Sequence, residues 1–288
     1  MDYKSLIVNG RSVRHFKETA VDAAKISELQ AFIADCKKLV PSIAIEAKFF
    51  AGDDTYKRLY GIAGYQGVMI EAPNYLVLLS EDKPQHLENA GYVGERAILK
   101  ARDLGLDSCW ISYSDRDMVK TVLNLDTDME VVALIALGYA SSTKKVEGIA
   151  KTGDNYSQAE MSVKKMGSNS ERISLEEMVY IDKWGNSATS EILEERALLD
   201  AFSYARMAPS ALNKQPWRFI VDGGRVILAI DNENYSGSYL NKIDAGIIML
   251  YFGVILDITM FDSKWGFDNL DNDYGIPSNY KVVGYCNI

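Results

Sequence analysis

Residues that build metal sites and disulfide frameworks are scarce in this chain of 288 residues. It has three cysteines, Cys36, Cys109 and Cys286, and two histidines, His15 and His86. An odd number of widely spaced cysteines argues against a disulfide framework and against a zinc site. We therefore expect no metal site, and we expect Cys36 and Cys109 to pack as small apolar side chains.

A long apolar run and a net positive charge are also missing. No stretch of about 18 apolar residues predicts a membrane span, and residues 1–5 contain no apolar signal core;. The formal net charge of −9 repels nucleic acid and anionic membranes;. We expect neither nucleic acid nor a membrane as partner, and a cytoplasmic location.

Apolar periodicity and turn signals predict helices and strands that alternate along the chain. Such an order is typical of the α+β class, in which helices flank a central mixed or antiparallel sheet. Residues 146–174 are rich in Lys, Ser, Asn and Gly and predict an irregular crossing segment. We expect helices over residues 22–39, 56–70, 87–104, 115–123, 191–207 and 244–261, and strands over residues 48–51, 74–80, 108–112, 131–139, 218–221, 225–230 and 281–286;.

Two features occur twice in the chain. A Pro-Ser pair follows a predicted helix at residues 41–42 and again at residues 209–210. Long apolar helices open with Asn-Ala-Gly at Asn89 and with Asp-Ala-Gly at Asp244, and a Trp follows each opening 21 residues later. Matched spacing of two markers predicts a duplicated chain with two pseudo-symmetric halves. The alternative is coincidence between two short apolar helices.

A cationic motif, Arg-Ser-Val-Arg at residues 11–14, lies near the start of the chain. Two guanidinium groups and a hydroxyl within four residues can hold one phosphate group. Taken alone, the motif could equally be a solvated basic turn before a helix.

A second dense motif, Ala-Pro-Ser-Ala-Leu-Asn-Lys-Gln-Pro-Trp-Arg-Phe, spans residues 208–219. It presents Ser, Asn and Gln side chains where a helix stops, so they can offer directed hydrogen bonds to a planar heterocycle. The alternative is an ordinary loop that leads from a helix into a strand.

Together these motifs resemble the signatures of the nitroreductase family, Arg-Ser-Val-Arg-x-Phe and Ala-Pro-Ser-x-x-Asn-x-Gln-Pro-Trp-x-Phe. Residues 101–111, 135–139 and 172–179 are similar to three further family segments, in the family's order. The resemblance implies a nitroreductase-like fold that binds FMN at the interface of intertwined subunits. One subunit supplies the Arg-Ser motif and its partner supplies the Pro-Ser-x-x-Asn loop.

The chain departs from the family pattern in a systematic way. Ile45, Ala47 and Phe49 stand in the first half where Asn213, Gln215 and Trp217 stand in the second. The second half in turn lacks an Arg-Ser-x-Arg motif. The resemblance therefore implies a single-chain pseudo-dimer with one surviving site. Its first half, residues 1–184, includes the crossing segment, and its shortened second half spans residues 185–288.

The resemblance also implies a role for individual residues, although Gly10 replaces an Arg that is frequent in the family. Arg11, Ser12, Arg14 and Arg172 would hold the phosphate and ribityl end. Backbone N–H groups near Ser112 and Tyr113 would approach the reactive flavin nitrogen. The second half would line the flavin with Pro209, Ser210, Ala211, Asn213 and Gln215.

The implied activity is reduction of nitroaromatics, quinones or similar small acceptors. NADH or NADPH would be the co-substrate, reduction would proceed by two-step hydride transfer, and no catalytic side chain would be needed. The alternatives are a flavin-binding sensor or store without turnover, and a flavin-remodelling or dehalogenating enzyme. A pseudo-dimer of this kind would be a monomer or a weak homodimer.

Overall fold

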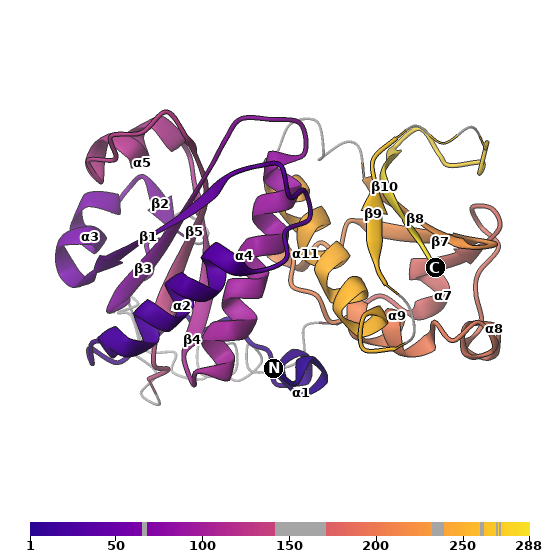
Figure 1. Cartoon of the computed structure of the whole chain (residues 1–288), viewed down its shortest axis with the longest axis horizontal. Coiled ribbons are helices and arrows are strands. Elements are labelled where there is room, and N and C mark those ends of the chain that lie inside the picture. The colour runs from indigo at the N-terminus through magenta and orange to yellow at the C-terminus, as the bar shows by residue number, and fades with distance from the viewer. Residues whose placement is uncertain (65–67, 142–170, 232–238, 260–261, 269, 271) are drawn as a thin grey trace, which may run out of the picture.

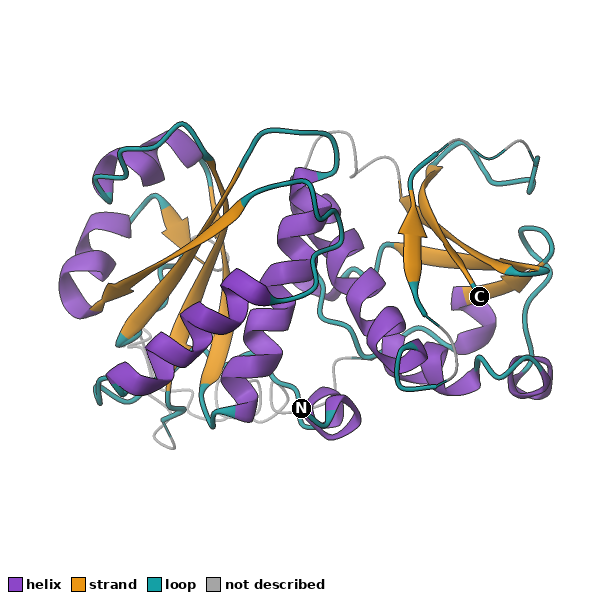
Figure 2. Ribbon diagram, viewed as in Figure 1, coloured by secondary structure: helices purple, strands orange, loops and turns teal. Residues whose placement is uncertain are grey.

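The chain forms two α+β halves that meet along a pair of long central helices (Figures 1 and 2). A computed structural model describes residues 1–64, 68–141, 171–231, 239–259, 262–268, 270 and 272–288. The predicted α+β class is confirmed, but each half contains its own five-stranded sheet, so there is no single central sheet. Most of the crossing segment predicted over residues 146–174 lies outside the described residues.

The first half contains one antiparallel sheet with strand order β1-β3-β5-β4-β2. Side chains alternate along β3, so Leu76 and Leu78 face α2 and α4 while Val77 and Leu79 face α3 and α5;. The elements are α1 (Tyr3–Val8), α2 (Ala23–Asp35), β1 (Ile45–Ala51), α3 (Gly52–Leu59), β2 (Ala63–Gly64), β3 (Asn74–Ser80), α4 (His86–Asp103), β4 (Asp107–Tyr113), α5 (Arg116–Val122) and β5 (Glu130–Gly138).

The second half contains a mixed sheet with strand order β6-β7-β8-β10-β9, in which only β6 and β7 are parallel. Phe219 of β7 packs against Phe202 of α9 and Phe252 of α11, so these helices cover one face. The elements are α7 (Leu175–Met178), β6 (Val179–Ile181), α8 (Ser190–Glu195), α9 (Leu199–Ala205), η1 (Ala211–Asn213), β7 (Trp217–Asp222), β8 (Arg225–Asp231), α11 (Tyr239–Leu256), β9 (Lys264–Gly266) and β10 (Tyr280–Asn287).

The same strand order recurs in the two halves. Four strands of each half, numbered one to four in chain order, lie side by side in the order one, two, four, three. They are β1-β3-β5-β4 in the first half and β7-β8-β10-β9 in the second. A long helix follows the second of these strands in each half, and Trp110 of β4 corresponds to Trp265 of β9. This recurrence supports the duplication that the spacing of Asn89 and Asp244 predicts.

The central helices α4 and α11 cross at their glycines. A Cβ atom on Gly91 would overlap the carbonyl oxygen of Ile243, and one on Gly246 would overlap that of Glu88. The two contacts are reciprocal. Gly91 touches Ile243, the residue just before Asp244, and Gly246 touches Glu88, the residue just before Asn89. Glycine is required at both positions since the helix backbones approach directly there.

Helix α11 is long and apolar enough to span a membrane, yet 83% of that stretch is buried inside the protein. It lies between α4 and α9 at the centre of the molecule (Figure 1). An apolar helix of this kind is the core helix expected of a large globular fold.

Several predicted boundaries are wrong for local reasons. The helix predicted over residues 191–207 is broken into α8 and α9, because Ala197 adopts a left-handed φ of 57°. The helix predicted over residues 56–70 ends at Leu59, and Gly61 turns the chain with a φ of 79°. The helix predicted to begin at Asp244 starts at Tyr239, and the helix predicted over residues 22–39 ends at Asp35.

Candidate active site

The cationic motif lies along the start of β4 in the first half. Ser12 forms a parallel bridge with Ser108, and the Val13 N–H donates to the Ser108 carbonyl at 2.9 Å. Val13 is buried, whereas Arg11, Ser12 and Arg14 are exposed. Arg11 contacts Asp107 at 3.4 Å, and its side chain is 68% exposed. The motif therefore places two exposed guanidinium groups and an exposed hydroxyl within four residues.

The second motif forms a strained loop between α9 and β7. Leu212, Asn213 and Gln215 have φ angles of 53°, 57° and 48° in the left-handed region, which costs energy for residues other than glycine;. Ser210 stabilises the loop, because its Oγ accepts the Gln215 N–H at 2.9 Å and its carbonyl accepts the Asn213 N–H at 3.0 Å. Strained loops of this kind are typical of binding sites.

The polar side chains of this loop bind the end of the crossing region. Arg172 donates to the Ala208 carbonyl at 2.8 Å and to Asn213 Oδ1 at 3.0 Å. Asn213 Nδ2 and Gln215 Nε2 both donate to the Glu171 carbonyl at 3.0 Å, and Gln215 Oε1 accepts the Ile173 N–H at 3.0 Å. Arg172, Asn213 and Gln215 are thus brought together, and in this structure they bind one another and the neighbouring backbone.

A buried polar cluster lies between α4 and α11. Glu95 of α4 accepts from Trp110 Nε1 at 2.8 Å and from the Tyr251 hydroxyl at 3.0 Å. Arg102, further along α4, donates to the Leu6 carbonyl at 2.7 Å, close to Gly10. Through Glu95 and Tyr251, the first half and the second half share a buried polar contact.

Burial dominates the electrostatics of this cluster. It raises the pKa of Glu95 despite the hydrogen bonds from Trp110 and Tyr251 and the charge of Arg102, and it raises the pKa of Tyr251. Burial also lowers the pKa of the Arg172 guanidinium. Glu95 and Tyr251 could not be found from the sequence, because single polar residues within apolar helices carry no motif.

The far end of β4 is closed by an aromatic pair. The Tyr113 N–H donates to the Tyr239 hydroxyl at 3.0 Å, and the two rings stack with centroids 4.7 Å apart. Ser112 Oγ donates to the Gly64 carbonyl at 2.8 Å. Tyr239 belongs to α11 of the second half, so both halves also meet at this end of β4. Tyr239 was not among the residues predicted from the sequence.

The residues present fit FMN unequally. Arg11, Ser12 and Arg14 have the charge and the exposure that a phosphate group requires;. At the other end, the Tyr113 N–H is engaged by Tyr239, and a flavin ring could reach it only if that hydroxyl moved away.

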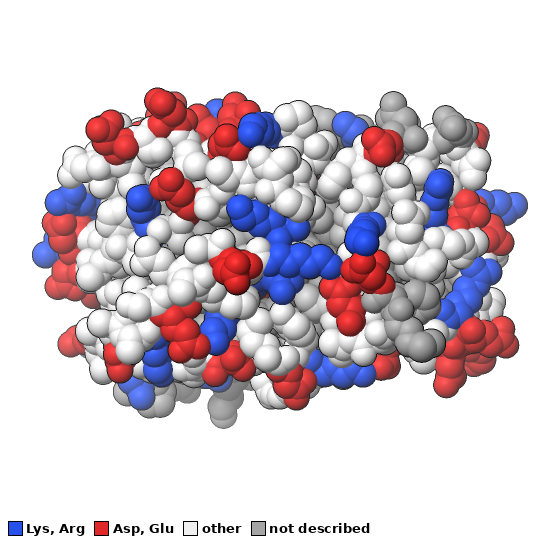
Figure 3. Space-filling model, in the orientation of Figure 1, with Lys and Arg blue, Asp and Glu red and all other residues white. Residues whose placement is uncertain are grey.

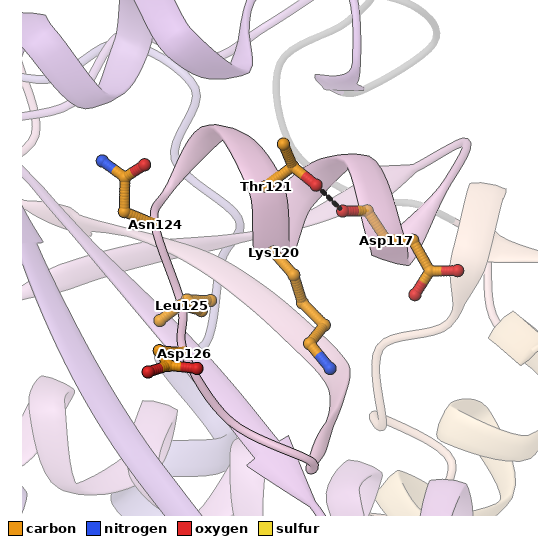
Figure 4. A pocket seen from close by; sticks show the side chains of 6 residues that line it. All are labelled: Asp117, Lys120, Thr121, Asn124, Leu125 and Asp126. Carbon is orange, nitrogen blue, oxygen red and sulfur yellow. Dashed lines mark hydrogen bonds between the residues drawn. The ribbon is translucent and has the colours of Figure 1, made fainter.

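A surface hollow beside α5 lies apart from these residues. It has a volume of about 470 Å³ and is lined by Asp117, Lys120, Thr121, Asn124, Leu125 and Asp126 (Figure 4). None of the predicted flavin contacts lines it. Within the described ranges, no group of three His, Cys, Asp or Glu residues could hold a metal ion. Both signs of charge are interspersed on the face shown in Figure 3.

Comparison with known proteins identifies the family. The family described as "Putative TM nitroreductase" matches residues 2–255. The chain belongs to this nitroreductase family. No curated protein matches it.

Among solved structures, a putative nitroreductase from Thermotoga maritima MSB8 is similar over 100% of this chain and 94% of its own. The TM-score is 0.59 and the sequence identity is 16%, so this likeness concerns the fold. A putative NADH oxidase from Clostridium acetobutylicum is 21% identical, over 48% of this chain and 89% of its own, with a TM-score of 0.41. The likeness to the Thermotoga nitroreductase extends over both halves of the chain.

Proposed function

We propose that this nitroreductase-family protein is an FMN-dependent NAD(P)H oxidoreductase that reduces nitroaromatics, quinones or similar small acceptors. The observation that carries the proposal is the pairing of motifs. The exposed Arg11, Ser12 and Arg14 side chains belong to the first half and the strained Pro-Ser loop belongs to the second. The two halves meet between these motifs, where Tyr251 of α11 donates to Glu95 of α4 at 3.0 Å. FMN, when bound, would accept a hydride from NADH or NADPH and pass it to the acceptor.

The chain's own residues would bind and orient the cofactor. Arg11, Ser12 and Arg14 would hold the phosphate by charge-assisted hydrogen bonds. Arg172 and Asn213, already bonded to each other, would fix the edge of the loop against residues 171–173. No side chain need act as acid, base or nucleophile. We further propose a cytoplasmic location and a monomeric or weakly dimeric pseudo-dimer.

A second candidate function is flavin storage or sensing without turnover. The contact between Tyr239 and the Tyr113 N–H favours it, because it occupies the amide that would otherwise polarise the flavin ring. A flavin absorption band in the purified protein, with thermal stabilisation by added FMN, would support both functions. Oxidation of NADH or NADPH with a quinone or nitroaromatic would support the reductase alone. A colourless protein that FMN does not stabilise would refute both.

A further inference from the structure

Asp244 of α11 lies directly beneath the strained loop of the second half. Both of its carboxyl oxygens lie 3.1 Å from the Ala211 nitrogen, which donates its N–H to them. The residue is only 3% exposed. Ala211 opens η1 and precedes Leu212 and Asn213, the first two residues of this loop that have left-handed φ angles. A buried carboxyl group therefore fixes the backbone at the point where the strained conformation begins.

The other half contains a matched contact. Asn89 of α4, the counterpart of Asp244 in the repeat, accepts the Val40 N–H at 3.0 Å. Val40 precedes the first Pro-Ser pair, as Ala211 follows the second. Asn89 of α4 thus binds the backbone just before the first Pro-Ser pair, after α2, and Asp244 of α11 binds the backbone just after the second, which follows α9. A neutral amide suffices in the first half, where the loop has lost its polar side chains.

We infer that Asp244 is a positioning residue that holds the Ala211 amide and so fixes the loop of Ser210, Ala211 and Asn213 for ligand binding. This inference rests on the proposed function, because that loop is one wall of the proposed flavin site. Asp244 does not itself face a ligand, since it is buried between the loop and α4. Its effect on binding passes through the backbone of residues 210–213.

Two readouts test the role separately. Hydrogen exchange of the Ala211 amide without added FMN reports the contact itself, and FMN titration reports its consequence. We expect Asp244→Ala to speed exchange of the Ala211 amide at least tenfold while the Ile220 amide of β7 stays protected. The same change should weaken FMN binding at least fivefold. Asp244→Ser, which is too short to reach the amide, should behave alike and replaces the Ala variant if that one fails to fold.

Asp244→Asn is the conservative variant, because an amide oxygen can accept the N–H as Asn89 does. We expect it to keep slow exchange and to retain FMN affinity within twofold. Asn89→Ala is the matched control, expected to leave FMN affinity unchanged although it removes the corresponding contact in the first half. Unchanged exchange at Ala211 in both short variants would overturn the inference. Failure of the unaltered protein to bind FMN would instead refute the proposed function and leave the exchange result valid.

Discussion

At the scale of single residues, the ionisation of Asp244 has the clearest consequence for stability. Complete burial raises its pKa to about 8, against the opposing effects of the Ala211 N–H and the Lys214 charge, while Glu95 raises it further. The folded state therefore keeps a proton that the unfolded chain releases near pH 4. Stability from this group is fully present below that pH and falls as the pH rises towards about 8.

Asp244→Asn should remove this pH dependence. We expect the unaltered protein to lose on the order of 5 kcal/mol of unfolding free energy through Asp244 between pH 4 and pH 8. The Asn variant should lose less over the same range and be the more stable protein at pH 8. Urea unfolding at several pH values measures this. If the unfolding free energies of the two proteins depend equally on pH, Asp244 is ionised in the folded state.

The Arg11 side chain is 68% exposed, and its contact to Asp107 is long, at 3.4 Å. Arg11→Ala should therefore leave thermal stability nearly unchanged and weaken FMN binding by about 1–3 kcal/mol, the range for a charged hydrogen bond. Isothermal titration with FMN measures the loss. Lys4→Ala is a control, since Lys4 forms an exposed ion pair with Asp200 away from the motif. An affinity unaffected by the Arg11 change would place the phosphate elsewhere.

At the scale of elements, the junction of β4 and α11 depends on the Tyr113–Tyr239 pair. Tyr239→Phe keeps the stacked ring but removes the hydroxyl that accepts the Tyr113 N–H. The free protein then has an unsatisfied amide, which a bound flavin would satisfy. We expect FMN to bind about fivefold more tightly, equivalent to about 1 kcal/mol. Weaker binding in a titration would show instead that the Tyr239 hydroxyl contacts the flavin.

Elements were predictable where the pattern is local. Strand β3 was predicted at its exact bounds because it contains a continuous apolar run at residues 75–79. Helix α4 was predicted within one residue because Gly105 caps it with a φ of 75°. The break at Ala197 was not predictable, since alanine normally favours a helix. Its left-handed φ belongs to a turn in which the Ala197 N–H donates to the Glu194 carbonyl at 2.9 Å and the Leu198 N–H to the Leu193 carbonyl at 2.8 Å. Strands β6 and β9 were missed because three residues are too few to show alternation.

The same limit applies to the candidate site. The residues of the Arg-Ser and Pro-Ser motifs were found from sequence because several unusual residue types are adjacent. Glu95, Tyr239 and Asp244 act across contacts between elements distant in the chain, so no short window contains their partners. The structure also showed that Asn213 and Gln215 bind residues 171–173, which spacing alone could not indicate.

At the scale of the whole molecule, the crossing of α4 and α11 joins the two halves. Gly91→Ala or Gly246→Ala would place a methyl group against the carbonyl of the facing helix, which backbone atoms cannot easily avoid. We expect each to lower the unfolding free energy by about 1–3 kcal/mol or more. Gly224→Ala is the control, because the nearest atom to its Cβ would lie 3.6 Å away. Chemical denaturation compares them.

The asymmetry of the halves determines how many cofactors one chain should bind. The counterparts of Asn213, Gln215 and Trp217 in the first half are Ile45, Ala47 and Phe49. All three belong to β1 and pair with residues of β3. In the second half the strand begins only at Trp217, so the polar residues before it remain in a loop. The first half thus uses for sheet pairing the segment that the second half presents to a ligand.

This difference predicts one FMN per chain. A second site would need β1 to give up its pairing with β3, and it would also need an Arg-Ser-x-Arg motif that the second half does not contain. Titration with FMN, followed by flavin and protein absorbance after gel filtration, should reach a molar ratio of one. A ratio of two would refute the pseudo-dimer. If the Asn213→Ala variant no longer reaches a ratio of one while the Ile45→Val variant still does, the site lies between the Arg-Ser motif of the first half and the loop of the second.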